Sequence, residues 1–157
     1  MDTPAEITLF IALTTGALVA GGQLFCRLAV IPAFTDWTPD FGVSVHQHAL
    51  TERPHRYLRV VSAVSIFSAA ATVALEHSAD APVLLTAAGL VLGIGNGVFS
   101  QREWPINDEI NEFGDSRTEE QVTRYKELRK KWDEQHTVRT VMSMTALACF
   151  AAAAVVA

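Results

Sequence analysis

Four runs of apolar residues, separated by polar segments, dominate the chain. A helix needs about 20 mostly apolar residues to cross the hydrocarbon core of a bilayer. Between residues 83 and 98 the only polar side chains are Thr86 and Asn96, and no charge follows Thr145. Because these helices lack the polar face of a soluble bundle, the pattern predicts an all-α, four-transmembrane-helix bundle in a single domain, 1–157. The predicted spans are about residues 7–31, 57–76, 81–101 and 138–157.

The segment before the fourth span has a different pattern. Residues 118–132 are rich in charged residues with apolar residues between them. Thr118 is placed to cap a helix, and Glu119 and Glu120 would lie in its first turn, where negative charge is favourable. The sequence therefore predicts an amphipathic cytoplasmic helix that leads into the fourth span.

The basic residues are sorted between alternate connections. All twelve lysines and arginines lie near the first connection (27, 53, 56 and 59) or the third (102 to 139). The N-terminus, the second connection and the C-terminus have none. By the positive-inside rule, loops rich in lysine and arginine lie in the cytoplasm. We therefore expect an integral protein of the cell membrane, with cytoplasmic first and third connections and both termini outside.

Composition narrows the classes of partner and chemistry. Only 18% of the residues are charged, whereas soluble domains carry about a quarter, which supports extensive contact with lipid. The net charge of -5 argues against a nucleic-acid partner, because phosphate binding needs a basic surface. Cys26 and Cys149 lie in apolar runs without a CxxC motif, so neither a redox pair nor a zinc site is expected.

Polar residues of the predicted spans fall on stripes at helical spacing. Ionisable groups at membrane depth are costly, so they usually face the bundle interior and pair. Each stripe lies towards the cytoplasmic end of its helix, which predicts one polar pocket beneath the cytoplasmic connections. The alternative is a structural role, in which the long side chains extend to the interface. The stripes are Gly16, Ala20, Gln23 and Arg27; His55, Arg59 and Ser62; Asn96, Ser100, Glu103 and Asn107; and Trp132, His136, Arg139 and Ser143.

Glu103 and Arg139 stand at the ends of successive spans that run in opposite directions, so both lie on the same side of the membrane. A lone charge buried there would cost roughly 2.5–3.5 kcal/mol. We therefore expect the two side chains to pair, directly or through a bound ligand. The alternative is that each reaches the cytoplasmic interface separately.

Two backbone features mark the third span. Pro105 removes a helix donor and clashes with the carbonyl four residues before it, which predicts a kink or an end of the helix there. Gly89, Gly93 and Gly97 repeat every four residues. Such a ridge lets another helix approach closely, so it is a candidate surface for a homo-oligomer.

Histidines offer a second kind of chemistry. His46 and His48 are two residues apart and would point to different faces of a helix, so they could share a metal only from a strand or loop. His136 could join them from the fourth span. We favour no metal, and we keep a copper or iron site of His46, His48 and His136 as the alternative.

Three short motifs carry a resemblance to a known family: Pro32-Ala33-Phe34 closing the first helix, Trp104-Pro105-Ile106-Asn107 after the third, and Arg129-x-x-Trp132-x-x-x-His136-x-x-Arg139-Thr140 before the fourth. Over nearly the whole chain the sequence resembles the anthrone-oxygenase-like family of small four-helix membrane proteins. The family pattern is similar to Asn-x-Pro-Leu-Asn followed by Trp-x-x-x-Asn-x-x-Arg. This chain has Glu103 and His136 where asparagine is usual.

The resemblance implies oxidation of an activated aromatic carbon, as from anthrone to anthraquinone, in natural-product biosynthesis. An anthrone is an apolar, weak carbon acid that could enter from the bilayer. It would lose a proton to His136 or Glu103 and form an enolate stabilised by Asn107 and by Arg139 or Arg27. An electron-rich enolate can react with oxygen directly, so the only co-substrate expected is molecular oxygen.

The candidate residues follow from the stripes and this chemistry. We expect the catalytic residues to be His136, Glu103, Asn107 and Arg139, and the substrate contacts to be Trp104, Trp132, Asn96, Gln23, Arg27, Arg59 and His55. Two other function classes stay open: a non-redox membrane cyclase or isomerase of the same architecture, and a membrane subunit that binds a small molecule without turnover.

Overall fold

The computed structural model describes residues 2–35, 39–47, 53–76, 78–113 and 118–157. The described residues are almost entirely helical, and no strand occurs among them. The long helices are α1 (Thr3–Phe25), α4 (Arg53–Leu75), α5 (Ala81–Ser100) and α7 (Glu119–Val156). The shorter elements are the π-helical η1 (Cys26–Val30), α2 (Ile31–Thr35), α3 (Pro39–Val45), the 3-10 turn η3 (Gln101–Glu103) and α6 (Trp104–Asn111).

Capping residues fix where the first and last helices begin. The side chain of Asp2 accepts a hydrogen bond from the Ala5 backbone N–H at 3.1 Å. Thr118 and Gln121 form a reciprocal capping box at the start of α7, in which each side chain accepts from the other's backbone N–H. Such a box satisfies two of the donors that a helix start leaves unpaired. The predicted cytoplasmic helix and fourth span are thereby one continuous helix of 38 residues.

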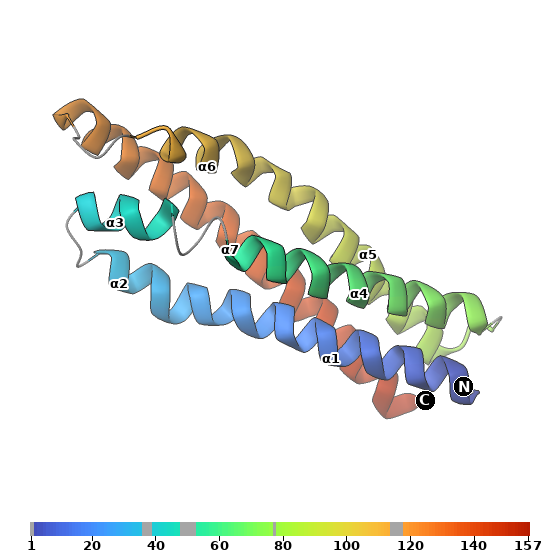
Figure 1. The fold of residues 1–157 in the computed structure, drawn as a ribbon. Coiled ribbons are helices and arrows are strands. Elements are labelled where there is room, and N and C mark those ends of the chain that lie inside the picture. Colours follow the sequence, from blue (N-terminus) through green and yellow to red (C-terminus); the bar gives the residue numbers. More distant parts are fainter. Residues whose placement is uncertain (1, 36–38, 48–52, 77, 114–117) are drawn as a thin grey trace.

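The four long helices form an up-and-down bundle (Figure 1). α1 packs mainly against α4 and α7, and α5 packs mainly against α7 and α4. Both chain ends lie at one end of the bundle, whereas α3 and α6 lie at the other (Figure 1). The predicted all-α four-helix fold is therefore confirmed, and the two long connections contribute helices to the same end.

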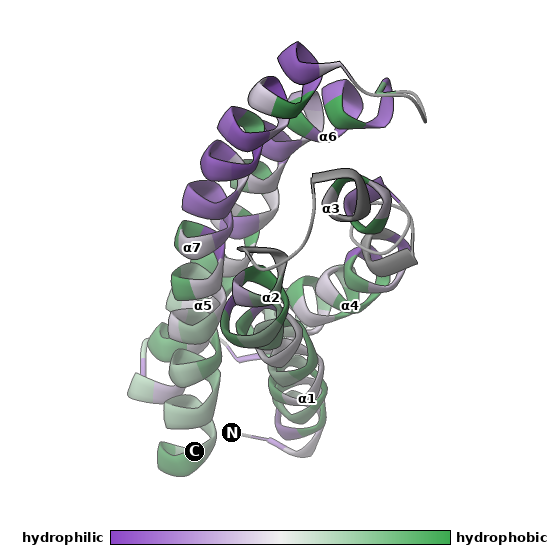
Figure 2. Cartoon of the chain, turned by 90° about the vertical axis from the view of Figure 1, so that its left-hand side faces the viewer, coloured by the Kyte–Doolittle hydropathy of each residue, from purple (hydrophilic) through white to green (hydrophobic). Residues whose placement is uncertain are grey.

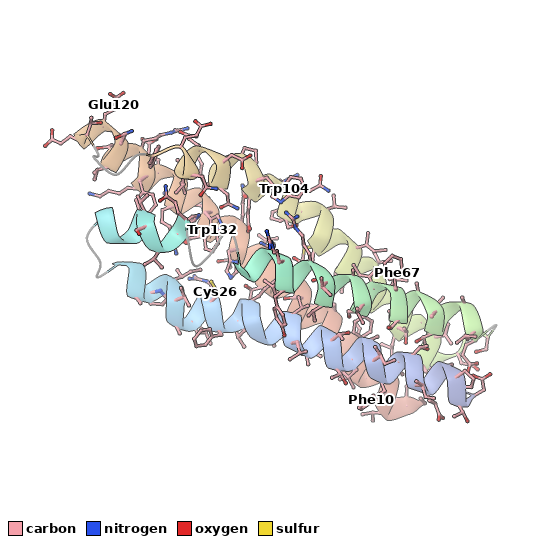
Figure 3. The ribbon with its side chains drawn as sticks, in the orientation of Figure 1. Phe10, Cys26, Phe67, Trp104, Glu120 and Trp132 are labelled. Atoms are coloured by element: carbon pink, nitrogen blue, oxygen red, sulfur yellow. The ribbon has the colours of Figure 1, made fainter. Side chains whose placement is uncertain are left out.

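Each long helix belongs to a segment that is long and apolar enough to cross a membrane. Large apolar side chains point outward, including Phe10 at 68% and Phe67 at 74% exposure (Figure 3). Figure 2 shows hydrophobic ribbon along the spans and hydrophilic ribbon along the first half of α7. Because exposed phenylalanines in this number would be costly in water, the surface fits an integral membrane protein.

Two prolines lie at the start of short helices and not at the end of long ones. The first helical segment was expected to close at Pro32, but it continues through α2 to Thr35. Pro32 lies in the first turn after the π-helical η1, where a missing backbone donor costs little. Pro105 likewise lies in the first turn of α6, after η3 has already interrupted the third span. The predicted break is present, and it precedes the proline.

The glycine ridge of α5 is divided between two environments. A Cβ on Gly89 would lie 2.5 Å from Cε1 of Phe150 on α7, and one on Gly93 would lie 3.6 Å from Ile66 on α4. A Cβ on Gly97 would meet nothing within 4 Å. Gly89 therefore serves packing within the chain, and the surface left for a second copy is the exposed part around Gly97. The homo-oligomer stays a prediction.

Candidate functional site

Polar side chains gather in the end of the bundle that carries α3 and α6. His46, Glu103, Asn107 and His136 are each at most 5% exposed. They come from the segment after α3, from η3, from α6 and from α7. Apolar residues of α2, α3, α6 and α7 form a buried cluster in the same end of the bundle, including Ile31, Val43, Ile106, Ile110, Leu128 and Trp132. The stripes expected on the third and fourth spans therefore do converge, and the first connection adds a residue to them.

His136 is oriented by the backbone of the first helix. Its Nε2 lies 3.2 Å from the main-chain oxygen of Gln23. A carbonyl oxygen only accepts, so Nε2 carries the proton and donates, and Nδ1 keeps its lone pair. Nδ1 is buried without a hydrogen-bond partner. The arrangement presents a neutral imidazole with a basic nitrogen in a dry environment.

Gln23 contacts α7 through both its backbone and its side chain. Its side-chain oxygen accepts a hydrogen bond from the Ser143 hydroxyl at 2.8 Å, and the residue is 2% exposed. The π-helical η1 begins three residues later. Single π-helical turns inside α-helices are frequent at functional sites. Here the turn lies beside the carbonyl that orients His136.

Glu103 and Arg139 form a direct ion pair in which an Arg139 Nη donates to Glu103 Oε2. The Glu103 side chain is 1% exposed and that of Arg139 is 13% exposed. The predicted pairing is confirmed. The other carboxylate oxygen, Oε1, is buried and has no hydrogen-bond partner, so Glu103 retains an acceptor inside the site.

His46 contacts Asn107 across the first and third connections. Its Nε2 lies 3.1 Å from Oδ1 of Asn107, and the residue is 0% exposed. Burial lowers the pKa of His46 to about 4, and the charge of Arg129 adds to that effect, whereas the hydrogen bond to Asn107 opposes it. His46 is therefore neutral at physiological pH.

Trp132 contacts both imidazoles. Its ring is stacked on His136, with centroids 4.9 Å apart and planes 5° from parallel. The ring of His46 meets it edge-on, with centroids 5.3 Å apart. The guanidinium of Arg129 lies 4.8 Å from the Trp132 ring centroid, and its Nε pairs with Asp133 at 2.9 Å. Trp132 thus joins the two imidazoles, and its role as a substrate contact stays a prediction.

Other expected contacts lie further out. Trp104 is 46% exposed, and the guanidinium of Arg59 lies 5.5 Å from its ring centroid. Arg27 is partly buried in η1. Arg59 and Trp104 therefore join α4 to α6 at the surface and do not line the buried cluster. The side chain of His55 lies outside what the structure describes.

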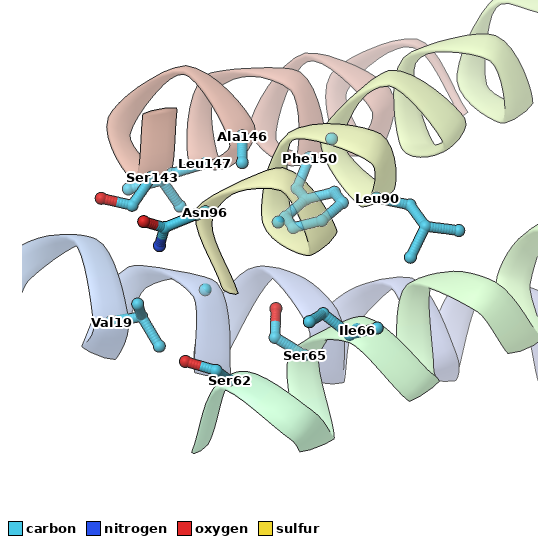
Figure 4. Close-up of a pocket in the computed structure, with 13 residues that line it drawn as sticks. Val19, Ser62, Ser65, Ile66, Leu90, Asn96, Ser143, Ala146, Leu147 and Phe150 are labelled. Atoms are coloured by element: carbon cyan, nitrogen blue, oxygen red, sulfur yellow. The ribbon is translucent and has the colours of Figure 1, made fainter. Parts of the chain in front are cut away.

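A cleft lies between the spans, and Ser143, which donates to the Gln23 side chain, is one of the residues that line it (Figure 4). All four long helices line it, and Asn96 and Ser143 lie at one end with Phe150 further along (Figure 4). The cavity volume is about 30 Å³, and the empty space around it, open side included, is about 400 Å³. Oδ1 of Asn96 is buried there without a partner. A fused-ring ligand would enter only if the side chains of the cleft moved.

The alternative metal site stays a prediction. Within the part of the chain that the structure describes, no group of three or more His, Cys, Asp or Glu side chains is arranged to hold a metal ion. His48, one of the three histidines of that alternative, lies outside the described residues. His46 and His136 both contact Trp132, and each directs its Nε2 to an oxygen of the chain.

Comparison with known proteins identifies a family for this chain. A family model described as anthrone oxygenase matches residues 48–149. The chain belongs to the anthrone oxygenase family. The match includes Glu103, Asn107, Trp132, His136 and Arg139 of the site, and it leaves out the first helix and α3. Comparison with curated proteins and with solved structures gave no match.

The contact between His46 and Asn107 could not be predicted from the sequence. His46 is expected there as a loop residue, with a metal ligand as the alternative, because nothing in its spacing tells which face of the bundle the first connection covers. The packing of α3 against α7 decides it, and that is a tertiary property. A buried asparagine at position 107 was expected, and its need for a polar partner was the one available clue.

Proposed function

We propose that this member of the anthrone oxygenase family is a membrane-embedded oxygenase that converts the activated methylene carbon of an anthrone-like aromatic into a carbonyl. The observation that carries the proposal is His136. Its Nε2 donates to the Gln23 carbonyl, and its buried Nδ1 has no partner. A neutral imidazole with a fixed tautomer is the group that removal of a proton from a weak carbon acid requires.

In the first step, His136 Nδ1 accepts a proton from the methylene carbon, and the electrons of that C–H bond form the enolate. Negative charge then develops on the ring carbonyl oxygen. The Arg139 guanidinium lies one helical turn from His136 on α7, and the Asn107 amide projects from α6. Donors already in place stabilise a developing oxyanion without reorganisation.

In the second step, the enolate transfers an electron to molecular oxygen, and the two radicals combine to form a carbon–peroxide bond. The proton held by His136 converts the peroxide to a hydroperoxide. Loss of the remaining C–H proton and cleavage of the O–O bond give the carbonyl and water. The balance is anthrone plus O2 to anthraquinone plus water, so the enolate supplies the electrons and no further reductant is needed.

The surroundings of the site suit an apolar substrate. The Trp132 ring is already stacked on His136 and lies under the Arg129 guanidinium, so an aromatic substrate would contact the apolar residues that pack with Trp132, such as Ile106 and Leu128. The cleft beside Asn96 is lined mainly by small and apolar residues of the spans. A substrate dissolved in the bilayer would approach the site between the spans, with movement of the side chains that line the cleft.

Oxygen uptake by the purified protein in detergent tests the proposal, with a hydroxylated anthrone as probe and its autoxidation subtracted. Wild type should consume one O2 per quinone formed, and His136→Ala should lose the enzymatic rate. Gly97→Ala, an exposed position away from the site, is the control and should keep it. Conversion of the probe without oxygen uptake would instead support a cyclase or isomerase, and retention without conversion a binding subunit.

A further inference from the structure

A second imidazole in the site has the same electronic arrangement as His136. Nε2 of His46 lies 3.1 Å from Asn107 Oδ1. An amide oxygen only accepts, so Nε2 carries the proton and donates, and Nδ1 holds a lone pair. Nδ1 is buried without a hydrogen-bond partner in a residue that is 0% exposed. A buried polar atom left unpaired costs free energy, which calls for a functional reason.

The fold fixes His46 in this place from both sides. Val43, one turn earlier on α3, is 0% exposed within the apolar cluster around Trp132. Gln47, the next residue, donates from Nε2 to the Ile110 carbonyl at 2.8 Å and to the Phe113 carbonyl at 3.2 Å. The first connection is thereby held against α6. A histidine that only filled space would not need a hydrogen bond to orient its ring.

The proposed reaction removes two protons from the same carbon. The first leaves the methylene group, and the second leaves that carbon once it carries the hydroperoxide. We propose that His46 is the base for the second removal, an inference that rests on the proposed function. His46 Nδ1 takes the remaining C–H proton, the C–H electrons form the carbonyl π bond, and the O–O bond breaks. The hydroxide that leaves takes the proton from His46 and departs as water, which restores His46; His136 was restored when it protonated the peroxide.

Asn107 is the positioning residue for this step. Its carbonyl oxygen holds the His46 tautomer in which Nδ1 is unprotonated. Trp132 contacts both rings, so the two bases border the same aromatic wall. In the proposed complex the reacting carbon lies beside Trp132, within reach of both Nδ1 atoms, so that each imidazole serves one of the two proton removals.

The main test is His46→Gln. A glutamine can keep the hydrogen bond to Asn107 through its amide N–H, but it has no basic lone pair. In wild type, quinone should form in step with oxygen uptake. In His46→Gln, oxygen uptake should continue while quinone formation falls at least about tenfold, as loss of a general base predicts. The substrate that takes up oxygen without becoming quinone should accumulate as its hydroperoxide. The hydroperoxide is measured after rapid quenching, by its reduction with triphenylphosphine.

Val43→Ala is the matched control, because it loosens α3 without touching the imidazole. It should show no hydroperoxide. If His46→Gln and wild type give the same ratio of hydroperoxide to quinone, or if Val43→Ala accumulates as much hydroperoxide as His46→Gln, the inference is wrong. A wild type that takes up no oxygen overturns the proposed function itself, which is a separate result.

A spectroscopic measurement tests the same inference without turnover. ¹⁵N-histidine NMR of the wild-type protein in detergent reports which ring nitrogen is protonated, and the His46 resonance is the one that disappears in His46→Gln. We expect the Nε2–H tautomer in wild type and its loss in Asn107→Leu. An Nδ1–H tautomer in wild type would overturn the inference, since no lone pair would then face the substrate.

Discussion

Arg139 and Glu103 are joined by an ion pair across the ends of the third and fourth spans, and Glu103 is 1% exposed. The pair lies one helical turn from His136 on α7. Removal of one partner leaves an uncompensated buried charge, which typically costs about 3–5 kcal/mol. The pair therefore couples the stability of the bundle to the chemistry of the site.

The first prediction concerns this coupling. Glu103→Gln and Arg139→Gln should each lower the thermal stability in detergent, and the double variant should be less destabilised than the sum of the two. A double-mutant cycle on melting temperatures measures the difference. Simple additivity would show that the two side chains do not interact in the protein. Loss of activity far beyond the loss of stability would place the pair in the active site.

The catalytic candidates give the second prediction. His136→Ala should lower the oxygen-uptake rate about a hundredfold, because a positioned base typically contributes 10²–10⁴-fold. Asn107→Ala should lower it at least about tenfold. Steady-state kinetics with a hydroxylated anthrone measure both effects. Full activity in His136→Ala would remove the imidazole from the mechanism.

The third prediction is a pH dependence of stability that arises from His46. Its pKa is lowered to about 4 in the folded protein from an ordinary value of 6.5, so the unfolded chain binds a proton that the folded protein excludes. This contribution is fully present above about pH 6.5 and is lost as the pH falls towards 4. The full effect is on the order of 3 kcal/mol.

Thermal unfolding of wild type and His46→Gln between pH 4 and 8 measures this contribution. As the pH is lowered from 6.5 towards 4, the melting temperature of wild type should fall by more than that of His46→Gln, because only wild type loses stability through His46. A constant difference across the range would mean that His46 is protonated in the folded state or exposed to water.

Gly89 and Gly97 provide the fourth prediction as a matched pair on one helix. Gly89→Ala places a Cβ 2.5 Å from the Phe150 ring and 3.1 Å from the Ala146 carbonyl oxygen. Overpacking of this kind costs about 1–3 kcal/mol. Gly97→Ala meets no atom within 4 Å and should gain up to about 1 kcal/mol from helix propensity. Melting temperatures in detergent compare the two, and equal effects would contradict the packing of α5 on α7.

Topology is the fifth prediction. Both termini lie at the end of the bundle opposite α3 and α6 (Figure 1), and the basic connections are expected to face the cytoplasm. Single cysteines at Asp2 and Ala157, in a background without Cys26 and Cys149, should react with a membrane-impermeant maleimide in intact cells. Labelling of both only after permeabilisation would invert the orientation.

The sequence was sufficient for the architecture and for the pairing of Glu103 with Arg139. The length of an apolar run and the spacing of polar residues along a helix are local properties, and neither changes when the helices pack into a bundle. The same spacing placed Asn107, Trp132 and His136 on buried faces, where they are found.

Contacts that depend on the connections could not be derived in this way. His46 meets Asn107 because α3 packs against α7, which is far away in the sequence. His136 donates its hydrogen bond to the main-chain oxygen of Gln23. Every residue has a main-chain carbonyl, so the residue type gives no sign of this contact. Arg59 had the spacing of a pocket residue and Trp104 was an expected substrate contact, but the two side chains meet at the surface.

Isotope labelling tests the central claim most directly. Purified wild type would be incubated with a hydroxylated anthrone under ¹⁸O2, and the quinone analysed by mass spectrometry with the uncatalysed product subtracted. We expect one ¹⁸O atom in each enzymatic product molecule and the other in water. A product that forms at the same enzymatic rate without oxygen, or that carries no ¹⁸O, would show that this protein is not an oxygenase.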